Sequence, residues 1–130
     1  MILVDTSVWI DHLRSDDANL TRLLEQGVVS MHDFVIGEIA CGTLRNREEV
    51  LSLLSSLPKC KSATHGEVLF FIDRHRLAGR GIGYVDISLL AAASLDHAHL
   101  WTRDRRLLAV AEDLECAYSP TSAIEEIQLQ

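Results

Sequence analysis

The sequence predicts an α/β fold in which a small parallel sheet lies between layers of helices, a three-layer α/β/α sandwich. Short apolar segments that are typical of buried strands alternate along the chain with longer segments of helical periodicity. The first strand is predicted at the start, where Ile2-Leu3-Val4 is followed by Asp5. A length of 130 residues is enough for one core, so we expect a single domain over 1–130.

Most predicted helices are followed by a residue that commonly terminates a helix. Gly27 and Gly42 follow the second and third helices, as expected of glycine after a helix, and Pro58 follows the fourth. Ser7 is predicted to cap the first helix. We expect helices at about 7–13, 16–25, 33–41, 46–57, 65–78, 85–97 and 104–114, strands at about 1–4, 28–31 and 99–102, strand candidates at 59–63 and 115–119, and a tail from 120 onward.

Composition is typical of a globular protein, with 48% apolar and 24% charged residues. No apolar run approaches the roughly 18 residues that span a membrane, and the first residues lack the features of a signal peptide. We therefore expect a soluble protein of the cytoplasm. Cys41, Cys60 and Cys116 have no CxxC spacing, which predicts reduced and buried thiols.

The formal net charge of −7 argues against a protein that binds nucleic acid through a broad basic surface. It does not exclude a nuclease whose pocket holds several carboxylates, because divalent cations bound there reverse the local field.

Four acids stand at the end of an element or inside an apolar stretch. Asp5 ends the first strand, Glu38 interrupts an apolar helix, and Asp104 follows the strand at 99–102. Asp86 opens the sixth helix, whose many alanine and leucine residues predict burial on nearly all sides. The carboxyl ends of parallel strands share one edge of a sheet, so Asp5 and Asp104 are expected to meet there. Sequence alone does not determine whether Glu38 and Asp86 join them.

Each of these acids also has a structural interpretation. Asp104 can be a helix N-cap, Asp86 a first-turn acid that complements the helix dipole, and Glu38 a surface residue. Asp5 is the hardest to explain in this way, because buried unpaired acids are rare. If the four meet, their mutual repulsion raises some of their pKa values unless a cation such as Mg²⁺ or Mn²⁺ is bound.

The segments around these acids resemble the ordered motifs of PIN-domain nucleases, and the size and opening residues resemble VapC toxins of toxin–antitoxin pairs. The segments are Asp5-Thr6-Ser7, Gly37-Glu38-Ile39-Ala40-Cys41-Gly42, the stretch from Asp86 to Ala93, and Thr102-Arg103-Asp104. The resemblance runs over nearly the whole chain, except that the segment at about 43–84 is diagnostic of nothing.

This resemblance implies a Mg²⁺- or Mn²⁺-dependent endoribonuclease that cleaves RNA, often tRNA or rRNA. It also implies a homodimer and an antitoxin whose segment covers the acidic pocket. Asp5, Glu38, Asp86 and Asp104 match the acidic cluster of the family, which is expected to be catalytic and to bind the metal. Two hydroxyls match supporting positions, Ser7 beside the first acid and Thr102 near the cluster.

Three arginines flank the last acid, and we expect Arg103, Arg105 and Arg106 to be candidates for contacts with RNA phosphates. The alternative is that arginines in a first helical turn are simply solvated.

Two other classes of function compete with a nuclease, a phosphotransferase and a module that binds proteins. A phosphotransferase with an aspartyl nucleophile of the haloacid-dehalogenase type needs a second Asp two residues after the first, where this chain has Ser7. A response-regulator receiver needs paired acids and a late lysine, and the only lysines are Lys59 and Lys61. The remaining alternative is a PIN-like module that binds protein partners and has a vestigial acidic pocket.

Overall fold

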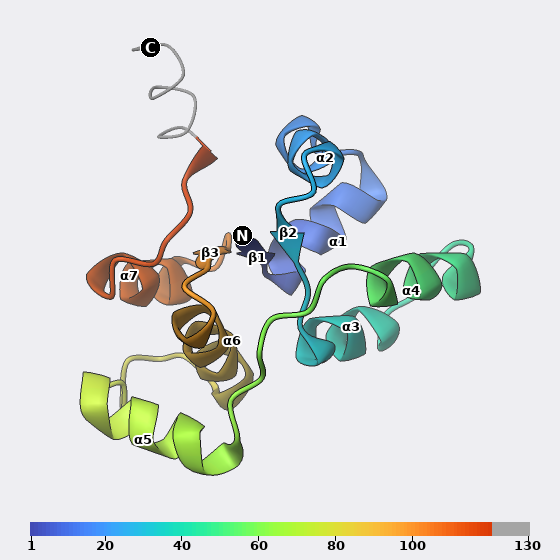
Figure 1. Ribbon diagram of the computed structural model, residues 1–130. Helices are drawn as coiled ribbons and strands as arrows, with labels where there is room; N and C mark the ends of the chain where they lie inside the picture. Colours follow the sequence, from blue (N-terminus) through green and yellow to red (C-terminus); the bar gives the residue numbers. More distant parts are fainter. Residues whose placement is uncertain (121–130) are drawn as a thin grey trace, which may run out of the picture.

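In the computed structural model, which describes residues 1–120, three short strands lie at the centre of the molecule. Figure 1 shows the first four helices on one side of these strands and the last three on the other. In chain order the elements are β1 (Ile2–Val4), α1 (Thr6–Arg14), α2 (Ala18–Glu25), β2 (Val29–Ser30), α3 (Asp33–Ala40), α4 (Arg47–Ser55), α5 (His65–His75), α6 (Tyr84–Leu95), β3 (His99–Trp101) and α7 (Arg105–Asp113). The predicted α/β class is confirmed.

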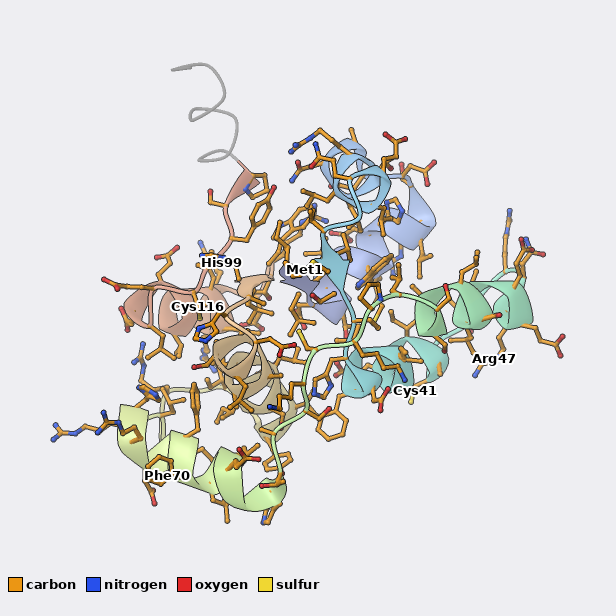
Figure 2. All side chains as sticks on the ribbon, viewed as in Figure 1. Met1, Cys41, Arg47, Phe70, His99 and Cys116 are labelled. Carbon is orange, nitrogen blue, oxygen red and sulfur yellow. The ribbon has the colours of Figure 1, made fainter. Side chains whose placement is uncertain are left out.

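The sheet has the order β2-β1-β3, and both pairings are parallel. Leu3 lies opposite Ser30 on one side and opposite Leu100 on the other. The strands start together, since Ile2 pairs with Val29 on one side and with His99 on the other. The His99 N–H donates to the Met1 carbonyl at 3.1 Å, and Figure 2 labels Met1 near the centre of the view and His99 to its left. Their carboxyl ends therefore share the opposite edge, where the predicted acids follow.

The strands and α6 supply many fully buried residues of the core, and the other helices pack their apolar faces against them. Leu3, Val4 and Leu100 are fully buried, and the seven consecutive residues 87–93 of α6 are all buried, which confirms the prediction for that helix. No helix within residues 1–120 combines the length and apolar character needed to cross a membrane.

The prediction that Ser7 caps the first helix was wrong. Helix α1 starts at Thr6 with Asp5 as its N-cap residue, so Ser7 lies inside the helix. The two strand candidates do not form strands: 59–63 and 115–119 each contribute a single bridge, Met31 to Lys59 and Leu100 to Ala117.

Helix α5 ends at His75, three residues before the predicted end, because Arg76 takes the left-handed conformation at φ 55°. Cys60 is buried as predicted, whereas Cys41 is exposed because it follows the last turn of α3. The predicted tail lies, from residue 121 onward, outside the described residues.

We expect Leu90→Ala to lower the free energy of unfolding by about 2–5 kcal/mol, because Leu90 is fully buried on α6 and its truncation leaves a cavity. Leu53→Ala is the matched control, since Leu53 on α4 is 61% exposed and its loss should change stability by less than about 0.5 kcal/mol. Urea unfolding measures both. Equal effects of the two substitutions would contradict the assignment of the core.

Candidate active site

Asp5 is the buried acid of the site, with only 6% of its surface exposed. Its backbone N–H donates to the Trp101 carbonyl at 2.9 Å, which joins it to β3. Its carboxylate Oδ2 accepts hydrogen bonds from the hydroxyls of Ser7, at 2.7 Å, and Thr102, at 2.8 Å. Two hydroxyls from different elements thus hold one carboxylate oxygen, which offsets the cost of burying the charge.

Asp104 lies at the same edge of the sheet and is the N-cap residue of α7. Its Oδ1 accepts from the Leu107 N–H at 2.9 Å, as the helix-cap interpretation predicted. Its own N–H donates to the Thr102 hydroxyl at 3.1 Å. Thr102 therefore links the backbone of Asp104 to the carboxylate of Asp5.

Glu38 and Asp86 come from helices that are distant in the sequence. Glu38 is exposed on α3, and its Oε1 accepts from the Thr6 hydroxyl of α1 at 2.7 Å. Asp86 lies in the first turn of α6, where its Oδ2 accepts from the Gly83 N–H at 3.3 Å.

The other three acids lie near enough to Asp86 for their charges to act on its pKa. Burial raises this pKa, and the hydrogen bond from Gly83 opposes the rise. The negative charges of Asp5, Asp104 and Glu38 raise it further. The ionised form of Asp86 is therefore disfavoured both by burial and by the three neighbouring carboxylates.

The donor set suits a hard cation. Each of the four carboxylates has one oxygen engaged by the chain, and its second oxygen accepts no hydrogen bond within residues 1–120. Oxygen-only ligands are those that Mg²⁺ and Mn²⁺ prefer. Within residues 1–120, no three Asp, Glu, His or Cys side chains are already arranged as a metal-binding group. The four acids therefore do not form a closed ligand shell in this structure.

Sequence reasoning missed Thr6 as a partner of Glu38. The only signal was a hydroxyl directly after Asp5, and the acid that it holds is 32 residues away. This pairing depends on the packing of α1 against α3, which are in direct contact.

The three arginines beside Asp104 differ in their surroundings. The guanidinium of Arg103 contacts two carboxylates, Asp11 at 2.6 Å and Asp17 at 2.7 Å, so it is not free for a phosphate. Arg105 and Arg106 form no ion pair within residues 1–120. The side chain of Arg106 lies against Gly81, where an added Cβ would be 2.9 Å from its Cδ.

A groove runs beside Glu38 between α1, α3 and the segment before α4. Its lining includes Ile10 and Leu13, which are 40% and 36% exposed, together with Arg14 and Arg45. Apolar and basic side chains thus border the acidic cluster on this side.

The model of the PIN domain family matches residues 2–113, which include all four acids. This chain belongs to the PIN domain family. It is also 48% identical over 128 residues to "Ribonuclease VapC32" of Mycobacterium tuberculosis, in strains H37Rv and CDC 1551, across 98% of this chain and 99% of the relative. The chain is therefore a member of the VapC ribonuclease group of PIN domains.

Two solved structures share the fold. PAE2754 from Pyrobaculum aerophilum has a TM-score of 0.67 at 19% identity, with 99% of this chain and 96% of that chain covered. FitAcB from Neisseria gonorrhoeae has a TM-score of 0.62 at 19% identity, with 86% and 94% covered. At this identity the two structures support the fold alone.

We expect Asp86→Asn to raise the melting temperature of the metal-free protein at neutral pH by a few degrees. Because the pKa of Asp86 is raised on folding, the folded chain binds that proton more tightly than the unfolded chain. The ionised Asp86 destabilises the folded state. This destabilisation is absent below the unfolded pKa near 3.8, grows as pH rises through the folded pKa, and is complete above it.

Thermal unfolding in EDTA at several pH values tests this. The difference in melting temperature between Asp86→Asn and the wild type should become smaller as the pH is lowered. Glu112→Gln removes an exposed acid from α7 and controls for the general effect of net charge. An equal gain from both substitutions would show that Asp86 carries no special repulsion.

Proposed function

We propose that this chain is a metal-dependent endoribonuclease, the toxin of a type II toxin–antitoxin pair, and that it hydrolyses RNA at the four-acid site. The observation that carries the proposal is the convergence of Asp5, Glu38 and Asp104 on the half-buried Asp86, whose pKa is raised first by burial and further by these three negative charges. Such a cluster is unfavourable in a folded protein unless a cation uses it. The similarity to a relative named as a ribonuclease supports the same reaction.

In this proposal Asp5, Glu38, Asp86 and Asp104 hold Mg²⁺ or Mn²⁺ through the oxygens that the chain leaves unengaged. The hydroxyls of Ser7 and Thr102 fix the orientation of Asp5, as second partners of metal ligands commonly do. When bound, such an ion would withdraw charge from the phosphodiester and lower the pKa of the attacking water.

Arg105 and Arg106 are the proposed contacts for RNA phosphates. They follow Asp104 in the first turn of α7 and form no ion pair within the described chain. A protein of net charge −7 needs such local positive charge to hold RNA near its acids. We propose tRNA or rRNA, encountered in the cytoplasm, as the substrate.

We propose that the antitoxin covers the acidic cluster through the groove beside Glu38. Ile10 and Leu13 offer apolar contact there, and a basic antitoxin side chain would be attracted by the four acids. Binding at this place would block RNA by occupying the same entrance.

We expect Asp5→Asn and Asp86→Asn each to reduce RNA cleavage by more than about a hundredfold, since even residues behind metal ligands affect activity by 10- to 100-fold. Asn keeps an oxygen for the existing hydrogen bonds, so circular dichroism should stay native. EDTA should stop cleavage of labelled tRNA and rRNA, and Mg²⁺ or Mn²⁺ should restore it.

Asp113→Asn is the matched control, because Asp113 is an exposed acid at the end of α7 that pairs with Arg80. Its activity should equal that of the wild type. Full activity of Asp5→Asn would refute the site. A wild-type chain that cleaves no RNA with either ion would favour the alternative function, a PIN-like module that binds protein partners and has a vestigial acidic pocket.

We also propose a homodimer, which an exposed apolar patch on α5 and α6 supports. Phe70 is 69% exposed and Leu95 41%, and both line one hollow between α5 and α6. Figure 2 shows Phe70 on α5 at the margin of the molecule. Patches of this kind are typical of protein interfaces.

We expect Phe70→Glu to convert the dimer to a monomer in sedimentation velocity, because it places a charge in the apolar contact. Leu53→Glu changes a similarly exposed residue of α4 and should leave the dimer intact. A wild-type chain that stays monomeric at micromolar concentration would contradict the dimer.

A further inference from the structure

Arg103 links the acidic cluster to a distant part of the same face. It lies between Thr102 and Asp104, yet its guanidinium contacts Asp11 of α1 at 2.6 Å and Asp17 at 2.7 Å. Asp17 is the N-cap residue of α2, and its other oxygen accepts from the Leu20 N–H at 2.9 Å. One side chain therefore ties the turn before α7 to both helices that follow β1.

The backbone of the same turn is attached to the site. The Arg103 N–H donates to the Ser7 hydroxyl at 3.0 Å, and that hydroxyl donates to Asp5. The next N–H, of Asp104, donates to the Thr102 hydroxyl, which also donates to Asp5. A shift of this turn would disturb both hydroxyls that hold Asp5 and the position of Asp104.

The contacts of Arg103 are arranged to resist such a shift. Its guanidinium lies 5.7 Å from the centre of the buried Trp101 ring, which adds a cation–π contact to the two ion pairs. Burial works to raise the pKa of Asp17, but the bonds from Leu20 and Arg103 hold that pKa below its ordinary value. Isolated surface ion pairs contribute little to stability, but networks of several charges contribute more. Arg103 forms such a network, because two fixed carboxylates share its guanidinium.

We infer that Arg103 is a positioning residue for the metal site: by clamping the turn at 102–104 to Asp11 and Asp17, it sets the affinity of the four acids for Mg²⁺ or Mn²⁺. This inference rests on the proposed function. It replaces the sequence expectation of a phosphate contact at Arg103, and leaves that role to Arg105 and Arg106.

Two sets of substitutions break the clamp from opposite ends. Arg103→Ala removes the cation, and the double variant Asp11→Asn with Asp17→Asn removes both carboxylate charges while keeping an oxygen for the α2 cap. Binding of Mn²⁺ alone to the full chain, without RNA, is measured by electron paramagnetic resonance of the free ion. Both variants should bind Mn²⁺ about tenfold more weakly, the scale seen when partners behind metal ligands are removed.

Arg103→Lys should recover part of the affinity, because lysine keeps the charge but lacks the fork that reaches two carboxylates. Arg80→Ala is the matched control, since it removes an ion pair of similar exposure, 2.8 Å to Asp113, away from the turn. Its Mn²⁺ affinity should equal that of the wild type. Circular dichroism verifies the fold of each variant, and the double Asn variant keeps the test valid if Arg103→Ala does not fold.

An unchanged Mn²⁺ affinity in either Arg103→Ala or the double Asn variant would overturn the inference. Weaker RNA binding by Arg103→Ala in Ca²⁺, with normal binding of Mn²⁺, would assign Arg103 to the phosphates instead. A wild-type chain that binds Mn²⁺ but cleaves no RNA would refute the proposed function and leave the result on Arg103 standing.

Discussion

The structure depends on one buried carboxylate at the end of the central strand. Asp5 ends β1, which pairs with both other strands, so its position is fixed from two sides. A charge in that place needs partners, and the hydroxyls of Ser7 and Thr102 provide them from α1 and from the turn after β3. The first turn of α1 and the turn before α7 are thus positioned by the same oxygen atom.

Helix N-termini offset part of the charge that this arrangement gathers. Asp5 and Asp104 are N-cap residues of α1 and α7, and Asp86 lies in the first turn of α6. The N-terminal end of a helix favours negative charge, so three of the acids sit where the backbone helps to stabilise them. Glu38 lies within α3 instead and is held by Thr6. Asp86 is half-buried and is also repelled by the other three acids, and a bound cation would offset that repulsion.

Local patterns were enough to predict the parallel sheet, from the alternation of strands and helices, and the buried α6, from its alanine and leucine content. The rule that parallel strands end at one edge was enough to place Asp5 and Asp104 together. Contacts that depend on how the side chains of distant helices pack were not predictable. The bond from Thr6 to Glu38 and the ion pairs of Arg103 with Asp11 and Asp17 depend on how helices pack. The helix-cap prediction for Ser7 was wrong, because its hydroxyl donates to the carboxylate of Asp5. This contact is the supporting position that the family resemblance implied for Ser7.

The central claim is that the four carboxylates repel one another in the metal-free protein and that a bound divalent cation removes this repulsion. Its most direct test is a titration of the Asp86 side-chain carboxyl by carbon-13 NMR, first in EDTA and then with saturating Mg²⁺. The account predicts a pKa above the ordinary 3.8 without metal and a clear fall when Mg²⁺ is added. An ordinary pKa that Mg²⁺ leaves unchanged would contradict it.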